Sequence, residues 1–300
     1  MSSEQLPVST PAAGVFESFD GTAIAFRVRG EATGLAPLFC CSGIACDEMY
    51  WTLLGPALAS ERQVVTWDYP YHGDSGPAAS PREITVASLA RHAHALGRHL
   101  GLPPAAFAGH SMGVQVALEY YRLFPEEVSG LALIAGPYRH TVAHLYGTPF
   151  GTLILTLVEA GARMRPEAAQ ALWRLAVTPE VADPVGRLGG LIGPAPPQMM
   201  RRYFRHLASL PLVPLVEMFK EGQLHSADAF LDDISVPVLI LHGTRDVMTP
   251  IALAREMAAR IPTAELVAVE GGAHTLPIED PELVNREVRR FLHRRVDRRA

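Results

Sequence analysis

Cysteines, long apolar runs and a secretion signal are scarce or missing in this sequence. Its 300 residues include only three cysteines, all between Cys40 and Cys46, so we expect neither a disulfide framework nor a zinc site built from two cysteine pairs. The longest apolar stretch, around residues 153–158, falls far short of the roughly 20 residues that a membrane-spanning helix needs. The first residues lack the basic and apolar segments of a signal peptide. We therefore expect a cytoplasmic protein without stable membrane insertion.

Charge of one sign is not in marked excess either. The formal net charge is −5, which argues against a nucleic-acid partner recognised by bulk charge. The arginine-rich residues 286–299 also contain Glu287, Asp297 and apolar residues at helical spacing, which indicates a solvated final helix. With 48% hydrophobic and 19% charged residues, the chain can bury a sizeable core.

Strand-like and helix-like segments alternate over most of the chain. A hairpin is predicted first, with strands at 15–19 and 22–29 joined by a two-residue Asp20-Gly21 turn. Later strands are uniformly apolar, which is typical of a parallel sheet covered by helices on both faces. The predicted strands are 37–42, 63–67, 105–109, 131–135, 236–242 and 265–269, and the predicted helices are 47–59, 84–100, 114–124, 251–260 and one that starts at Pro281.

This alternation stops after Gly136 and resumes near residue 233. Between them, helical patterns at 151–164, 166–177, 198–207 and 211–222 are separated by Pro and Gly, without a convincing strand. We therefore predict a flexible segment at 1–14, an α/β core domain of residues 15–136 and 233–300, and a helical cap of residues 137–232.

Residues 109–113, Gly-His-Ser-Met-Gly, match the G-x-S-x-G nucleophile elbow. An apolar strand enters this motif and a helix leaves it. The flanking glycines allow a tight turn that lifts the Ser111 hydroxyl above the sheet and leaves backbone N–H groups free at the helix N-terminus. Ser111 is the predicted nucleophile.

A serine nucleophile needs a general base that is oriented by a third group. Asp246 follows an apolar strand, and His274 lies in a Gly-rich loop after the next one. Both are at carboxyl strand ends, where active sites of open α/β sheets form. The other histidines are predicted to pack in the core, lie on the surface or, for His72 and His110, make structural hydrogen bonds. Asp228, Asp232 and Asp233 precede the strand and would lie at its wrong end.

Acyl transfer also requires N–H donors where negative charge develops on the substrate carbonyl oxygen. The backbone N–H of Met112, directly after the nucleophile, is one predicted donor. The second is the N–H of Ile44, in the loop after the third strand.

Together these residues resemble the α/β-hydrolase superfamily, in its helical-cap branch of serine esterases and lipases. The resemblance spans about residues 15–295. Its motifs are Gly-His-Ser-Met-Gly at 109–113, His-Gly-Thr-Arg-Asp at 242–246, Gly-Gly-Ala-His at 271–274 and Asp-Tyr-Pro-Tyr-His-Gly-Asp-Ser at 68–75. The resemblance implies an eight-stranded sheet with an antiparallel second strand and a cap inserted after the sixth strand.

The same resemblance implies that the catalytic serine, acid and base are Ser111, Asp246 and His274. Two departures from the family pattern lie near the site. The usual His-Gly before the oxyanion loop is Ser42-Gly43 here, and the usual Arg-Gly of the loop after the fourth strand is Pro70-Tyr71.

These residues predict hydrolysis of a small to medium hydrophobic carboxylic ester through an acyl-enzyme, without a metal or organic cofactor. We expect Gly43, His110, Phe150 and Leu153 to line the substrate pocket, because they flank the nucleophile or belong to the apolar cap. Alternatives on the same triad are a thioesterase or other acyl-chain hydrolase, a perhydrolase, and a C–C bond hydrolase or lyase. The non-enzyme alternative is a ligand receptor that retains the triad. A monomer or homodimer is expected.

Overall fold

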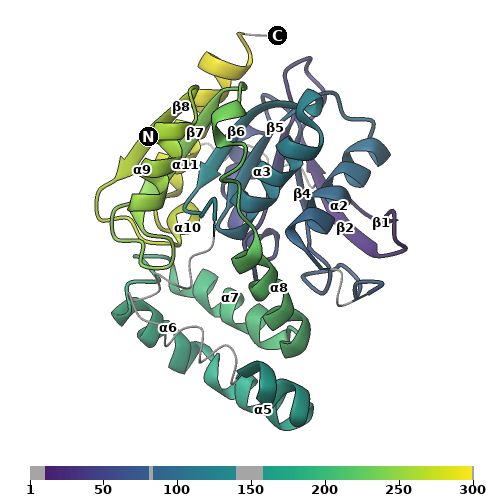
Figure 1. Ribbon diagram of the computed structural model, residues 1–300, viewed down its shortest axis with the longest axis vertical. Helices are drawn as coiled ribbons and strands as arrows, with labels where there is room; N and C mark the ends of the chain where they lie inside the picture. Colours follow the sequence, from purple (N-terminus) through teal and green to yellow (C-terminus); the bar gives the residue numbers. More distant parts are fainter. Residues whose placement is uncertain (1–10, 81–83, 140–157, 299–300) are drawn as a thin grey trace, which may run out of the picture.

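Eight strands form one sheet in the computed structural model, which describes residues 11–80, 84–139 and 158–298 (Figure 1). The sheet order is β1-β2-β4-β3-β5-β6-β7-β8. β2 runs antiparallel to β1 and β4, and the other neighbouring strands pair in parallel. The strands are β1 Ala12–Glu17, β2 Ala23–Arg29, β3 Leu38–Cys41, β4 Val64–Trp67, β5 Ala105–His110, β6 Val128–Ile134, β7 Val238–Gly243 and β8 Ala264–Val269. This is the predicted mostly parallel, eight-stranded α/β fold.

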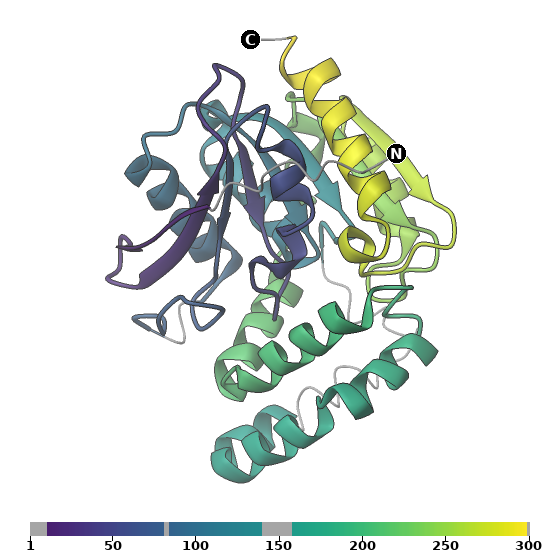
Figure 2. The same cartoon turned by 180° about the vertical axis from the view of Figure 1, so that it is seen from behind.

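Helices cover both faces of this sheet, as Figures 1 and 2 show from opposite sides. Side chains alternate along each strand, so Phe39 of β3 packs on one face while Leu38 and Cys40 pack on the other. The first face is covered by α2 Val86–His99, α3 Met112–Leu123 and α9 Ile251–Arg260, and the second by α1 Leu54–Leu58 and α11 Pro281–Phe291. Because both faces are covered, the inner parallel strands β3 to β7 are mostly apolar and buried.

The N-terminal hairpin differs from the prediction at its boundaries. β1 begins at Ala12, which pairs with Val28, so the strand starts three residues before the predicted one. The connection between Glu17 and Ala23 is also longer than the predicted two-residue turn. Within it the Ser18 N–H donates to the Thr22 carbonyl, and the Asp20 side chain accepts from the Thr22 N–H.

The helix predicted over residues 47–59 is divided in two. A 3-10 helix, η1 Glu48–Trp51, precedes α1, and the Asp47 side chain caps it by accepting from the Met49 N–H at 2.8 Å. Pro56 explains the division, because proline has no N–H to bond back to Thr52 and its ring would clash with that carbonyl in a continuous helix.

The described part of the chain between β6 and β7 contains the helices α5 Pro166–Ala176, α6 Pro179–Leu188, α7 Pro197–Ser209 and α8 Leu212–Leu224, and residues 158–164 before α5 are helical as well. We call them the helical insertion. Both views show them together at one end of the sheet. The prediction missed α6, because Pro184 lies inside it and proline normally interrupts a helix.

The remaining elements are short: η3 Pro125–Glu127, η5 Leu231–Asp233, α10 Leu276–Glu279 and the π-helical turn η6 Leu292–Val296. Among all described residues, no helix combines the length and apolar character required to cross a membrane.

Candidate active site

Ser111 occupies a strained turn between β5 and α3. Its backbone angles are φ 54° and ψ −123°, a region that residues other than glycine rarely adopt. The turn is closely packed: a Cβ atom at Gly113 would lie 2.0 Å from the Cys41 carbonyl oxygen, and one at Gly109 would lie 2.4 Å from the Gly113 carbonyl oxygen. Only glycine fits at these two positions, as the elbow motif predicts.

The structure brings the three predicted side chains together at the carboxyl ends of the strands. His274 Nε2 lies 2.9 Å from Ser111 Oγ, and His274 Nδ1 lies 2.9 Å from Asp246 Oδ2. Asp246 follows β7 and His274 follows β8, so parallel strands place both residues at the same sheet edge as the elbow. Serine, histidine and aspartate thus form one continuous line of hydrogen bonds.

Asp246 is held as an acceptor on every side. Oδ1 accepts from the backbone N–H groups of Met248 and Thr249, both at 2.9 Å, and Oδ2 also accepts from Thr249 Oγ1 at 2.7 Å. Burial alone would raise the pKa of Asp246, but His274, His242 and the Thr249 backbone N–H hold the pKa below its ordinary value. The ionised carboxylate therefore keeps a proton on His274 Nδ1 and leaves Nε2 free to accept the serine proton.

The loop that carries His274 is fixed by two further residues. Glu279 Oε1 accepts from the Ala273 N–H at 2.6 Å, and His110 Nε2 donates to the His274 carbonyl at 2.9 Å. The His110 ring is stacked on Tyr50, with 4.6 Å between ring centroids. Burial lowers the pKa of His110 to about 3, so the ring is neutral at neutral pH. The predicted structural hydrogen bond of His110 is therefore present.

A small cavity of about 40 Å³ opens beside Ser111. Both predicted oxyanion residues, Ile44 and Met112, are on its wall together with Ser111. Apolar side chains predominate, and Gln115, Gln223 and Thr249 add polar groups. The described lining residues are Ile44, Ser111, Met112, Gln115, Pro137, Phe219, Gly222, Gln223, Met248 and Thr249.

Of the four residues expected to line the substrate pocket, the structure describes Gly43 and His110, and neither is among the residues that line this cavity. A Cβ atom at Gly43 would lie 3.0 Å from Ser111 Cβ, so Gly43 packs directly against the nucleophile. His110 is 1% exposed and contacts Tyr50 and His274 instead of the wall of this cavity. Its position on β5, behind the elbow, turns its ring into the protein. Phe150 and Leu153 lie outside the described residues.

The alternative bases and acids make structural contacts. His242 Nε2 donates to the Thr249 carbonyl at 2.5 Å, beneath Asp246. Asp228 and Asp232 both pair with Arg260, at 3.0 and 2.7 Å, away from the elbow, as their position before β7 predicts.

All three cysteines are free and buried, Cys40 and Cys41 on β3 and Cys46 in the loop that follows. Burial raises the pKa of Cys41 to about 12, so this thiol is protonated and unreactive at neutral pH. Across the described ranges, no group of three or more His, Cys, Asp or Glu side chains is arranged to hold a metal ion.

Sequence reasoning missed several residues that shape the site. Gln115 lines the cavity and donates from Nε2 to the Gly222 carbonyl at 2.7 Å, which joins α3 to α8. Its position on α3, four residues after Ser111 at the N-cap of that helix, was a usable signal. The contact of Glu279 with Ala273 had none, because a backbone N–H acceptor cannot be read from residue type.

The fold and the site together define a protein of the α/β-hydrolase class. Residues 36–281 match the family model described as alpha/beta hydrolase fold. Since the match covers most of the chain, the protein belongs to this family.

Two relatives and one solved structure show how far the similarity extends. The chain is 29% identical over 272 residues to the "Dihydrolipoyllysine-residue acetyltransferase component of acetoin cleaving system" of Pseudomonas putida, covering 90% of this chain and 66% of that protein. It is 25% identical over 271 residues to "Putative carbamate hydrolase RutD" of Caulobacter segnis, covering 90% of this chain and 96% of the relative. A thermophilic esterase from Thermogutta terrifontis superposes with a TM-score of 0.74 at 21% identity, over 95% of this chain and 98% of the other, which shows a shared fold.

Proposed function

We propose that this protein is a serine hydrolase that cleaves a small to medium hydrophobic carboxylic ester through an acyl-enzyme. The observation that carries the proposal is the unbroken line from Ser111 Oγ through His274 to Asp246, with 2.9 Å at each of its two hydrogen bonds. Family membership agrees with hydrolase chemistry, and the esterase with the same fold agrees with an ester substrate.

In the first step, Ser111 Oγ attacks the ester carbonyl carbon while His274 Nε2 takes the hydroxyl proton. Asp246 stabilises the imidazolium that forms. The tetrahedral intermediate then collapses, the bond to the leaving alcohol breaks, and His274 returns its proton to the alcohol oxygen. Water repeats the sequence on the acyl-enzyme, which releases the carboxylic acid and restores Ser111.

The negative charge of each tetrahedral intermediate needs donors close to Ser111. The N–H of Met112 begins α3, where the helix has no intrahelical acceptor for it. Ile44 is on the same cavity wall, so its N–H is the second donor in this proposal.

The substrate class follows from the cavity and the helical insertion. Ile44, Met112, Pro137, Phe219 and Met248 give the cavity a largely apolar lining, which suits a hydrophobic acyl or alcohol group. Phe219 belongs to α8, so we propose that the insertion acts as a lid over the nucleophile.

A carbamate is the second candidate substrate. It is favoured by the relative named as a carbamate hydrolase, whose length this chain matches almost completely. Carbamate cleavage would use the same nucleophile and the same donors, and only the acyl group transferred to Ser111 would differ.

The test compares the wild type with Ser111→Ala on p-nitrophenyl acyl esters of graded chain length and on an aryl carbamate. We expect Ser111→Ala to lose turnover while its circular dichroism spectrum is unchanged. Ser60→Ala is the matched control. It changes an exposed serine that is distant from Ser111 in the sequence, and it should keep full activity. Undiminished hydrolysis by Ser111→Ala would end the proposal, and turnover of the carbamate alone would transfer it to the second candidate.

A further inference from the structure

The loop that carries Ile44 forms a tight turn with an unfavourable residue at its third position. The Cys46 N–H donates to the Gly43 carbonyl at 3.2 Å, and Ala45 has a φ of 61° while Ile44 does not have a positive φ. This is the pattern of a type II turn, which normally places glycine or asparagine where Ala45 stands. Something outside the turn must therefore favour this arrangement.

His72 supplies the contact that favours it. Its Nε2 accepts from the Ala45 N–H at 3.0 Å, and its Nδ1 lies 2.9 Å from the Pro70 carbonyl oxygen. A carbonyl can only accept and a backbone N–H can only donate, so Nδ1 carries the proton and Nε2 presents its lone pair. The partners of the ring thus define a single tautomer, in which His72 is an acceptor for the turn.

The His72 ring is itself enclosed. It is 2% exposed and lies against Tyr69, at 6.0 Å between centroids, and against His206 of α7, at 5.8 Å. Burial lowers the pKa of His72 to about 4, and the hydrogen bond to Pro70 and the nearby Asp47 only partly oppose this. The ring is therefore neutral, and able to accept, over the neutral pH range.

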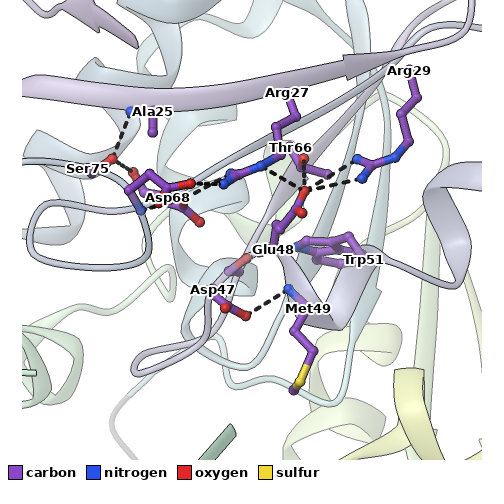
Figure 3. A network of polar contacts seen from close by, with 12 residues as sticks. Ala25, Arg27, Arg29, Asp47, Glu48, Met49, Trp51, Thr66, Asp68 and Ser75 are labelled. Atoms are coloured by element: carbon purple, nitrogen blue, oxygen red, sulfur yellow. Dashed lines mark hydrogen bonds and ion pairs between the residues drawn. The ribbon is translucent and has the colours of Figure 1, made fainter. Parts of the chain in front are cut away.

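The loop that carries His72 is anchored by a buried polar network, shown in Figure 3. Arg27 of β2 reaches Asp68 at 2.9 Å and Glu48 of η1 at 3.3 Å, and Asp68 also accepts from the Asp74 N–H at 3.1 Å. Tyr71, where the family pattern has glycine, keeps a left-handed φ of 68°. The network joins the His72 loop and η1 to the same strand, so both sides of the Ile44 turn are fixed to the sheet.

Resting on the proposed function, in which the Ile44 N–H is an oxyanion donor, we infer that His72 is a positioning residue for that donor. Without its acceptor, the peptide between Ile44 and Ala45 can rotate to a type I turn. This rotation removes the unfavourable φ of Ala45. It also turns the Ala45 N–H away from the buried position in which it has no acceptor. The Ile44 N–H belongs to the preceding peptide and is not turned by this rotation itself, but the turn loses the contact that anchors it to the His72 loop, so the donor is no longer held where the oxyanion forms.

Two variants and one control separate positioning from general packing. His72→Leu removes the acceptor, His72→Gln keeps an acceptor oxygen at the end of its side chain, and His206→Leu removes the neighbouring ring without affecting Ala45. Steady-state kinetics with p-nitrophenyl acetate and inhibition by a trifluoromethyl ketone, which forms a tetrahedral oxyanion on the serine, are measured for each. Each variant is assayed well below its melting temperature.

We expect His72→Leu to lower kcat about 10- to 100-fold with little change in KM. Its affinity for the ketone should fall by the same factor as kcat/KM. His72→Gln should recover most of the loss, and His206→Leu should stay within about twofold of the wild type. An unchanged kcat or ketone affinity in His72→Leu, or an equal loss in His206→Leu, would overturn the inference.

A measurement on the wild type keeps the inference testable if His72→Leu fails to fold. Nitrogen-15 NMR of the histidine rings should show His72 protonated on Nδ1 and bare on Nε2 at neutral pH, and the opposite tautomer would refute the assignment. Failure of the proposed function is separately visible: in that case the wild type itself shows no hydrolysis that depends on Ser111, and the role of His72 falls with it.

Discussion

Replacing Asp246 by Asn tests the role of the carboxylate with almost no change in shape. Both oxygens of Asp246 act only as acceptors, from Met248, Thr249 and His274. An asparagine that keeps its oxygen on the two backbone N–H groups must turn its NH₂ group toward His274 Nδ1. The imidazole then has to present a lone pair at Nδ1 and carry its proton on Nε2, where it cannot accept the serine proton.

The size of the effect follows from this change of tautomer. An Asp-to-Asn change in a triad of this geometry lowers kcat by about 10⁴-fold, which corresponds to about 5.5 kcal/mol of transition-state stabilisation. The assay is kcat/KM on p-nitrophenyl acetate at neutral pH, with the fold checked by circular dichroism. Asp228→Asn, which changes an aspartate paired with Arg260, is the matched control and should retain full activity. A loss smaller than tenfold in Asp246→Asn would refute the reasoning.

Three further predictions concern stability, each measured by urea unfolding. Gly113→Ala should prevent stable folding, because its Cβ would lie 2.0 Å from the Cys41 carbonyl oxygen. Gly161→Ala, in the helical residues 158–164 and with no atom within 4 Å of the added Cβ, should instead stabilise the protein by about 1 kcal/mol. Equal effects of the two variants would contradict this account. The pKa of His72 is lowered to about 4, so below about pH 6.5 the unfolded chain binds a proton that the folded chain does not. The free energy of unfolding therefore decreases as the pH is lowered, and His72→Gln should remove about 2 kcal/mol of the decrease between pH 7 and pH 5. An unchanged pH dependence in this variant would count against the prediction. Arg27→Met should lower the free energy of unfolding by about 3–5 kcal/mol, because it leaves the buried Asp68 carboxylate unpaired. Adding Asp68→Asn should recover more than half of this loss. Additive losses in the double variant would show that the pair is not coupled.

The residues of the candidate site could be proposed from the sequence because they combine residue type with a position at a strand end. Ser111, Asp246 and His274 each follow an apolar strand that the sequence pattern indicates, and parallel pairing brings those strand ends to one edge. The alternation of apolar strands and helices along the sequence was sufficient to predict the sheet. For these features, local sequence and global topology point to the same arrangement.

Other features depend on partners that residue type does not specify. Ala45 and His72 are 27 residues apart, and the contact joins a side chain to a backbone N–H, so neither identity nor spacing indicates it. Helix α6 was missed because Pro184 normally argues against a helix. The N-terminal connection was predicted too short because Asp20-Gly21 suits a two-residue turn, whereas the pairing of Glu17 with Ala23 leaves five residues between the strands.

Covalent labelling by a fluorophosphonate, followed by mass spectrometry of the digested protein, tests most directly whether Ser111 is an activated nucleophile. The account predicts one label per chain on the peptide that contains Ser111, and greatly slowed labelling in His274→Ala. A wild-type protein that stays unlabelled, or that carries the label on another residue, would contradict it.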